Sequence, residues 1–471
     1  MGCKSQFRTG SERNSLSDGK RDALQPSGMR ATAGRFLESW SWRRAASVLA
    51  LLPIGLAHPQ SPCPGRPQLY DGGSGVDDYA QVDVVDLPTS ALILGVPRRM
   101  PSTALDYITI KGFKSIAAIE ELPLRSVNIV IGANGAGKSN LIGVFSFLHA
   151  IREGRLRDYV TAAGGAERLL HFGSKTTKEM SFHLSFKDGI NQYGLKLSPT
   201  ADDGLFPTEE IAYYWKKSQY PSPYGTGLSP REQGREAGIS NPKAERVAGW
   251  VRERLGGWRL YHVHDTSSSS PMRKTAKVDD NEFLRPDGSN LAAFLFYLRE
   301  SHPDSYSLIQ RAVQRVTPFF DDFRLKPLRR KVDDIKLEWR HKGSDQYFDA
   351  SSLSDGTLRF IILATLFLQP DLYRPSVILV DEPELGLHPY AIGMLASLIR
   401  QASVQTQVIV STQSSLLLDH FDPDDVLIAN RVDGGTQMSR LDSAQLAAWH
   451  EDYSLGQLWE KNEIGGRPVK G

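Results

Sequence analysis

The sequence predicts an α/β fold: a mostly parallel core sheet flanked by helices, with a smaller antiparallel β lobe. Short apolar runs rich in β-branched residues, such as Val127–Ile131 and Ser376–Val380, alternate with helical patterns such as Ser139–Ile151. Strands that alternate with helices form parallel sheets covered on both faces. Residues 180–216 instead contain period-two stretches (MSFHLSF, QYGLKL, EIAYYW) separated by turn residues, which predicts antiparallel strands.

The predicted elements follow in a definite order along the chain. A first strand, Tyr107–Ile110, precedes Val127–Ile131, which leads through a glycine-rich turn into the helix Ser139–Ile151. The stretch Ser218–Pro242 is rich in Pro, Gly, Ser and charged residues and predicts a mobile loop. Further expected elements are helices at Asn290–Glu300, Ser305–Val316, Ser354–Leu368 and Tyr390–Arg400, and a strand at Gln407–Ser411.

Composition divides the chain close to its hundredth residue. Residues 1–99 are rich in Ser, Gly, Arg and Pro without a sustained period, which predicts an extension with little fixed structure, or a start codon assigned too far upstream. Residues 100–465 form the predicted structured unit. We expect its core to consist of 100–217 and 350–465, with an inserted lobe and mobile loops at 218–349.

Charge and cysteine content exclude several classes of protein. The 56 basic and 54 acidic side chains give a net charge of +2, which excludes a histone-like polyelectrolyte. Residues 1–70 carry a net charge of +6, so the remaining residues total −4, and this disfavours avid binding of free DNA. Because the only cysteines are Cys3 and Cys63, a disulfide framework, a cysteine zinc site and a cysteine nucleophile in the body are excluded.

A glycine-rich loop predicts a phosphate-binding site. The string GANGAGKS fits the pattern G-x-x-x-x-G-K-[ST] and stands between a predicted strand and a predicted helix, as that motif requires. Backbone N–H groups of such a loop point at phosphate oxygens, and the helix N-terminus favours an anion. The residues predicted to bind the nucleotide here are Gly132, Ala133, Asn134, Gly135, Ala136, Gly137, Lys138, Ser139 and Asn140, with Lys138 on the β- and γ-phosphates and Ser139 on Mg²⁺.

A second apolar strand ends in two adjacent acids. The string VILVDEPE places Asp381 and Glu382 at the carboxyl end of its strand, beside the predicted phosphate site. We predict that Asp381 holds the Mg²⁺ shell and that Glu382 polarises the attacking water as general base.

A short motif before that strand resembles the signature motif of ABC-type ATPases. The string LSDGT at Leu353–Thr357 stands at the start of a predicted helix, where the family's usual form is Leu-Ser-Gly-Gly-Gln. In the family this segment closes on the γ-phosphate bound by the other subunit. The resemblance therefore implies that Ser354 and Gly356 bind ATP in trans, and that the chain forms a homodimer around ATP.

Two further strings narrow the resemblance. Ile108–Ser115 (ITIKGFKS) is similar to the opening of RecF-like and SMC-like ATPases, and Glu382–Pro389 (EPELGLHP) resembles the segment after the catalytic Glu in RecF-like and OLD-like proteins. The likeness spans about 105–465 and is to stand-alone AAA family ATPase heads. The 58 residues after Gln413 leave no room for an OLD-type nuclease domain, and no heptad stretch for an SMC coiled coil is present in the sequence.

Two departures from the family pattern stand out. Where ABC-type enzymes carry a switch His, this chain has Gln413, which can hydrogen-bond a γ-phosphate or water but cannot take a proton as His can. The Gln-bearing loop that senses Mg²⁺ in the family has no clear counterpart: Gln192 lies in a strand-like run, and His171 in the string LLHFG is only a weak stand-in. In the string HVHD, His262 and His264 face one side of a strand, which favours a structural or nucleotide-adjacent role over a metal site because further ligands are missing.

The sequence thus predicts a slow, Mg²⁺-dependent cytoplasmic ATPase, with ATP and Mg²⁺ as cofactors, in DNA repair, DNA maintenance or anti-phage defence. Its candidate partners are a second copy of the chain, DNA and a separate effector nuclease, with no stable membrane partner. One alternative is an ATP-gated module that controls a separate nuclease or toxin, and a weaker one is the nucleotide-binding subunit of a transporter. Export is a further alternative, since Arg43 and Arg44 precede the apolar run Ala45–Ala57, but an exported ATPase would lack ATP.

Overall fold

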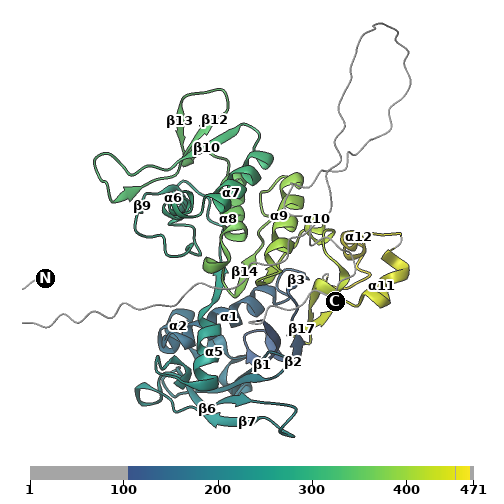
Figure 1. Ribbon diagram of the computed structural model, residues 1–471. Helices are drawn as coiled ribbons and strands as arrows, with labels where there is room; N and C mark the ends of the chain where they lie inside the picture. The colour runs from purple at the N-terminus through teal and green to yellow at the C-terminus, as the bar shows by residue number, and fades with distance from the viewer. Residues whose placement is uncertain (1–103, 451, 467–471) are drawn as a thin grey trace, which may run out of the picture. The chain divides into compact units, whose positions relative to one another are not determined.

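A computed structural model describes residues 104–450 and 452–466, so the expectations for residues 1–99 lie outside the described residues. The centre of the described part is a six-stranded sheet, parallel except at one edge (Figure 1). Its strands, in spatial order, are β17 (Gly435–Arg440), β16 (Val426–Val432), β3 (Val127–Gly132), β15 (Gln407–Ser411), β14 (Val377–Asp381) and β8 (Trp258–Tyr261).

The order of the strands sets where the predicted site residues lie. Strand β15 pairs in parallel with β3 on one side and with β14 on the other. In this register Ser411 stands level with Asp381 and with Val130. Because parallel strands end at the same edge of a sheet, the segments that follow β3, β14 and β15 meet at one edge.

Strand β8 was not expected in this sheet. It lies within residues 218–349, the segment predicted to form an inserted lobe, yet it pairs in parallel with β14. Trp258, at its start, is buried against Phe145, with ring centroids 5.0 Å apart. The sequence WRLY is too short for its periodicity to distinguish a strand of the central sheet from a strand of a separate lobe.

A second six-stranded sheet is antiparallel, as predicted for residues 180–216. Its strands, in spatial order, are β2 (Ile116–Pro123), β1 (Leu105–Phe113), β4 (Met180–Phe186), β5 (Asn191–Pro199), β6 (Leu205–Tyr214) and β7 (Tyr224–Gly227). The stretch Ser218–Pro242, expected to be a mobile loop, contributes β7 and two short 3₁₀ turns instead. Its backbone groups therefore find partners in the edge of the sheet and in turns.

Alternate residues of the central strands pack into two hydrophobic cores. Ile129 and Ile131 of β3 belong to the core that includes α6 (Leu291–Ser301), α7 (Pro303–Val316), α8 (Asp355–Leu368) and α9 (Pro389–Ala402). Val130 belongs to the core that includes α1 (Lys138–Arg152), α5 (Arg246–Gly256) and the antiparallel sheet. Figure 1 shows these two groups of elements separated by the central strands. The sheet is thus buried on both faces, which explains its continuous apolar strands.

Helix α8 is buried on all sides from Leu358 onward. Every residue from Leu358 to Leu368 is buried, including Arg359. A helix with this composition needs neighbours on all sides, and α7 and α9 both pack against it. The start of α8 is consequently held in place by the surrounding core.

The remaining elements are short. Residues 276–349 add β9 (Ala276–Lys277) with β11 (Asp334–Ile335), and β10 (Phe320–Arg324), β12 (Glu338–His341) and β13 (Tyr347–Asp349). The other helices are α2 (Leu156–Ala163), α3 (Ala166–Leu169), α4 (Gly173–Thr176), α10 (Ser415–Leu418), α11 (Ser443–His450) and α12 (Leu455–Glu460). Among the helices of the described residues, none has the length and apolar character needed to span a membrane.

One buried side chain ties the two large sheets together. Gln407, at the start of β15, is fully buried. Its Oε1 accepts from the Leu105 N–H at 3.1 Å, and its Nε2 donates to the carbonyls of Leu105 and Arg125, both at 3.0 Å. A buried polar group that loses its partner costs free energy, so this amide fixes β1 against the central sheet.

We predict that Gln407→Leu lowers the free energy of unfolding by about 1–3 kcal/mol for each backbone group left unpaired. Urea denaturation followed by fluorescence measures this loss. Gln405→Leu is the matched control, because Gln405 is exposed two residues away on the same chain segment. Equal stability of the two variants would contradict the assigned role of Gln407.

Candidate functional site

The glycine-rich loop joins β3 to α1 and leaves the start of the helix open. Helix α1 begins at Lys138, and its N-cap residue, Gly137, offers no side chain to the backbone. The first turn contains no acidic residue. The first N–H groups of a helix have no partner within it, and the macrodipole makes this end positive. The loop therefore presents donors and partial positive charge to an anion such as a phosphate.

Gly137 cannot carry a side chain in this conformation. Its φ of +107° lies in the left-handed region, and an added Cβ would stand 2.0 Å from Thr436 Oγ1 of β17. Gly135 also has a positive φ, +77°, but an added Cβ there would meet no atom within 4 Å. The two glycines thus serve different purposes: Gly137 permits close packing, whereas Gly135 permits only the turn.

Lys138 lies at the mouth of the loop. Its buried ammonium donates from Nζ to the carbonyls of Gly132 at 2.7 Å and Ala133 at 3.2 Å. Burial lowers the pKa of Lys138, while the carboxylates of Glu382 and Asp381 oppose that shift. The ammonium thus contacts the phosphate loop and interacts electrostatically with the acids at the end of β14.

Asp381, at the end of β14, and Ser139, in α1, lie close together. Ser139 Oγ, in the first turn of α1, donates to Asp381 Oδ2 at 3.5 Å, and Ser411 Oγ donates to Asp381 Oδ1. An octahedral Mg²⁺ with ligands at about 2.1 Å places neighbouring oxygens about 3 Å apart. The hydroxyl and the carboxylate therefore fit one Mg²⁺ shell completed by water and phosphate oxygens, the usual composition of such a shell.

Glu382 is held in an unusual backbone conformation. Its φ of +43° is rare for a residue with a side chain and indicates local strain. Its N–H donates to the carbonyl of Ser411 at 2.9 Å, and Gln413 Nε2 donates to Glu382 Oε1. The predicted base and the predicted switch residue are thus in direct contact at the edge of the sheet.

Glu384 is a further carboxylate that the sequence interpretation did not assign. Its Oε1 accepts from Thr412 Oγ1 at 2.5 Å and from the Gln413 N–H at 3.2 Å, so it braces the segment after β15. Burial raises the pKa of Glu384, and the nearby charge of Glu382 adds to that rise. The sequence shows that Glu384 follows the two acids at the end of β14, but it does not show that the side chain of Glu384 is buried.

Side chains outside the phosphate loop form hydrogen bonds that brace it. Asn140 Nδ2 donates to Ser115 Oγ at 2.6 Å, and Ser115 Oγ lies 2.7 Å from Thr436 Oγ1. Thr436 Oγ1 in turn donates to the carbonyl of Ala136 at 2.9 Å. The side chain of Asn140, predicted to bind nucleotide, is thus engaged in bracing the loop. In addition, Arg431 Nη1 donates to the Gly135 carbonyl at 3.2 Å.

The histidines and the glutamine left open by the sequence occupy different places. His262 directly follows β8, and because Tyr261 pairs with Val380 it stands level with Asp381. Burial lowers the pKa of His262, and the charge of Asp381 opposes that shift. Gln192 is buried in β5, where its Oε1 lies 3.0 Å from His183 Nε2. Within residues 104–450 and 452–466, no group of three or more His, Cys, Asp or Glu side chains could hold a metal ion.

The predicted signature residues form a second group at the start of α8. Ser354 is the N-cap, and its Oγ accepts from the Thr357 N–H at 3.1 Å. An added Cβ at Gly356 would stand 2.3 Å from the carbonyl of Gly386, so this glycine permits close contact with the segment after Glu382. In the described residues, the contacts that join Lys138, Ser139, Asp381, Glu382 and Gln413 do not include Ser354 or Gly356.

Comparison with known protein families identifies the family of this chain. The family described as "AAA domain, putative AbiEii toxin, Type IV TA system" matches residues 127–419, more than half of the chain. The chain belongs to this AAA family. The match includes the glycine-rich loop, the acids after β14 and the start of α8. It confirms the prediction of an AAA ATPase head with a phosphate-binding loop.

Solved structures of SMC head domains are similar to the chain at low identity. An SMC head bound to the C-winged helix domain of ScpA is 16% identical, has a TM-score of 0.48, and the match covers 73% of this chain and 99% of the other. An SMC head from Thermotoga maritima is also 16% identical, with a TM-score of 0.37 and coverages of 72% and 99%. A head with an extended coiled coil, bound to the C-terminal domain of ScpA and derived from Pyrococcus furiosus, is 15% identical, with a TM-score of 0.46 and coverages of 74% and 98%.

No curated protein matches the chain.

Between α1 and α8, which is a fully described part of the chain, the longest helix is α7 with 14 residues. The head domain therefore carries no coiled coil between these two helices, as the sequence predicted.

We predict that Gly137→Ala destabilises the loop more than Gly135→Ala. Both variants place a side chain at a positive φ, which costs roughly 1–2 kcal/mol, but only Gly137→Ala adds a steric clash with Thr436. Urea denaturation and titration with a fluorescent ATP analogue measure the two losses. A Gly137→Ala chain as stable as Gly135→Ala, with the same affinity for the analogue, would contradict the packing described here.

Proposed function

We propose that this member of an AAA ATPase family hydrolyses ATP with Mg²⁺ at the edge formed by β3, β14 and β15. Residues Gly132–Ser139 bind the phosphates, Ser139 and Asp381 hold Mg²⁺, and Glu382 is the general base. The observation that carries the proposal is the convergence of Lys138, Ser139, Asp381, Glu382 and Gln413 through direct contacts and opposing charges.

The reaction assigns a distinct task to each side chain. A bound Mg²⁺ neutralises charge on the β- and γ-phosphates. Lys138 exchanges its contacts with the loop carbonyls for contacts with phosphate oxygens. Glu382 orients a water and accepts its proton as the water oxygen bonds to the γ-phosphorus, and the bond to the β–γ bridging oxygen breaks to leave ADP and phosphate.

We propose that this site hydrolyses ATP slowly. The residue beside Glu382 is Gln413, whose amide donates to the carboxylate of the base. An amide can position water or a phosphate oxygen, but it cannot accept and return a proton as imidazole does. The Glu382–Gln413 contact must rearrange before Glu382 accepts a proton, because the Gln413 amide already occupies Glu382 Oε1.

The signature segment completes the site in trans. Ser354 and the first N–H groups of α8 form a second anion-binding position. The hydroxyl of Ser354 accepts from the Thr357 N–H and lies 2.8 Å from Thr357 Oγ1, where either hydroxyl can be the donor. When the Thr357 hydroxyl donates, the proton of Ser354 is available to a phosphate oxygen. Two chains related by a two-fold axis would each place this segment on the γ-phosphate held by the other, giving a homodimer with two ATP molecules at its interface.

We place this ATPase in the cytoplasm, in anti-phage defence or DNA maintenance. The family description, which names a toxin of a toxin–antitoxin system, supports defence. A second candidate is an ATP-gated module that controls a separate nuclease or toxin, and the Gln413 contact with Glu382 favours it because slow turnover suits a switch that remains closed while ATP is bound. Turnover measured with and without double-stranded DNA ends distinguishes DNA from protein as the stimulating partner.

We predict that Lys138→Ala lowers kcat/KM by about 10²–10³ and that Glu382→Gln lowers kcat by about 10²–10⁴. Glu382→Gln should retain ATP and accumulate as a dimer, because binding and closure precede the lost step. Phosphate release and sedimentation velocity with ATP and Mg²⁺ measure both effects. Lys175→Ala and Glu463→Gln are the matched controls, since both side chains are exposed and outside the site. Turnover at the parent rate in both site variants would refute the assignment.

A further inference from the structure

The signature segment of this chain carries its own negative charge. Asp355 is the first residue of α8 and directly follows Ser354. Its side chain is 65% exposed, so its carboxylate lies on the surface that the proposed function assigns to an incoming γ-phosphate. A carboxylate is favourable at a free helix N-terminus. It opposes the arrival of a second anion at the same helix end.

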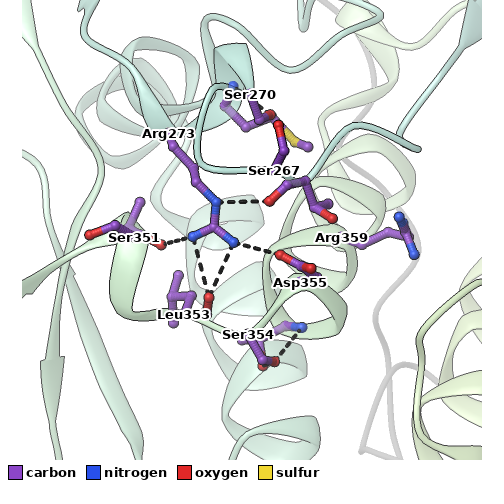
Figure 2. Close-up of polar contacts among 12 residues, drawn as sticks. Ser267, Ser270, Arg273, Ser351, Leu353, Ser354, Asp355 and Arg359 are labelled. Carbon is purple, nitrogen blue, oxygen red and sulfur yellow. Dashed lines mark hydrogen bonds and ion pairs between the residues drawn. The ribbon is translucent and has the colours of Figure 1, made fainter.

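A buried arginine from another part of the chain forms hydrogen bonds and an ion pair with this segment. Arg273 ends a short 3₁₀ turn after β8, and its side chain is only 7% exposed. Its Nη2 donates to Asp355 Oδ1 at 2.8 Å and to the Leu353 carbonyl at 3.2 Å. Figure 2 shows the Arg273 guanidinium beside Leu353 and Asp355, with Asp355 at the start of α8.

The other donors of Arg273 are also committed to backbone carbonyls. Nη1 donates to the carbonyls of Ala350 and Leu353, the latter at 3.3 Å, and Nε donates to the carbonyl of Thr266 at 3.0 Å (Figure 2). A guanidinium has five N–H donors in a fixed plane, so these contacts fix the signature backbone relative to the loop after β8. Because Leu353 immediately precedes Ser354, the contacts also fix the direction of the N-cap.

Within residues 104–450 and 452–466, Asp355 is the one acidic side chain that forms an ion pair with this guanidinium. The buried positive charge and the exposed negative charge therefore cancel at the start of α8. With the pair intact, an approaching phosphate meets the Ser354 hydroxyl and the helix N–H groups with no net opposing charge. Without the guanidinium, the same phosphate would meet a carboxylate that has lost its ion-pair partner and is compensated only by the charge of Arg359, which forms no ion pair with it.

We propose that Arg273 is the positioning residue of the signature segment: it fixes Leu353 and neutralises Asp355, so that α8 can accept the γ-phosphate of ATP held by a second copy of the chain. This inference rests on the proposed function, closure of two chains around ATP. Arg273 does not touch the nucleotide; it acts through Leu353, Ser354 and Asp355.

The test measures ATP-dependent dimerisation in full chains that carry Glu382→Gln, by sedimentation velocity with ATP and Mg²⁺. Arg273→Ala is expected to weaken the dimer by roughly ten- to hundredfold, the scale of a lost hydrogen bond to a charged group. Adding Asp355→Asn to Arg273→Ala is expected to strengthen the dimer by about tenfold relative to Arg273→Ala alone, as in a charge-coupled double-mutant cycle. A purely structural role would give no such recovery.

Asp355→Asn alone keeps the test decisive if Arg273→Ala fails to fold. This exposed change leaves the Arg273 charge in place, so the dimer is expected to be at least as tight as that of the Glu382→Gln parent. The matched control is Arg340→Ala, which removes another Arg–Asp ion pair, Arg340 Nη2 to Asp321 Oδ2 at 2.6 Å, between β12 and β10. The affinity of Arg273→Ala for a fluorescent ATP analogue should stay within about twofold of the parent, because ATP binds first to the chain's own loop.

The outcomes separate the inference from the function on which it rests. If Asp355→Asn weakens the dimer, or does not strengthen the dimer of Arg273→Ala, the inference is wrong while the ATP-dependent dimer remains. If the Glu382→Gln parent itself does not dimerise with ATP, the proposal that two chains close around ATP is wrong. The proposed role of Arg273 is then wrong as well.

Discussion

The site depends on the parallel pairing of β15 with both β3 and β14. This pairing brings Ser411 level with Asp381 and places the segment after β15 beside the phosphate loop. The contacts of Ser139 with Asp381 and of Gln413 with Glu382 follow from that strand order. Gln407, at the start of the same strand, ties it to β1, so one strand connects the antiparallel sheet to the site. A shift of β15 by one residue would turn each of its side chains to the opposite face and disassemble the site.

Two neighbouring glutamates illustrate how the environment assigns roles. Glu382 is partly exposed, has a strained backbone and interacts electrostatically with Lys138, so it can meet water. Glu384 is buried, its pKa is raised by burial, and it braces Thr412 and Gln413. Similar carboxyl groups placed in different surroundings take different tasks. The start of α8 obeys the same rule, because the Asp355 charge there is paired with the buried guanidinium of Arg273.

The sequence was sufficient to predict the elements whose local pattern is strong. The motif around Lys138, the apolar strand before Asp381 and the helix after Ser354 all form close to the expected bounds. The place of β8 was missed because a four-residue strand has no informative period, and its partner β14 lies more than a hundred residues away. Tertiary contacts determine how Glu384 braces Gln413 and how Arg273 hydrogen-bonds to Leu353 and Asp355. No local sequence pattern could have identified these contacts.

In the proposed homodimer, each complete ATP site combines the phosphate loop of one chain with the signature segment of the other. Mixing Lys138→Ala chains with Ser354→Arg chains tests it most directly, because each variant alone has two defective sites per dimer. In a mixed dimer, one site has both its loop and its signature intact. Random pairing in a two-fold dimer predicts that an equal mixture recovers up to about a quarter of the parent ATPase rate. A mixture no faster than either variant alone would contradict the account.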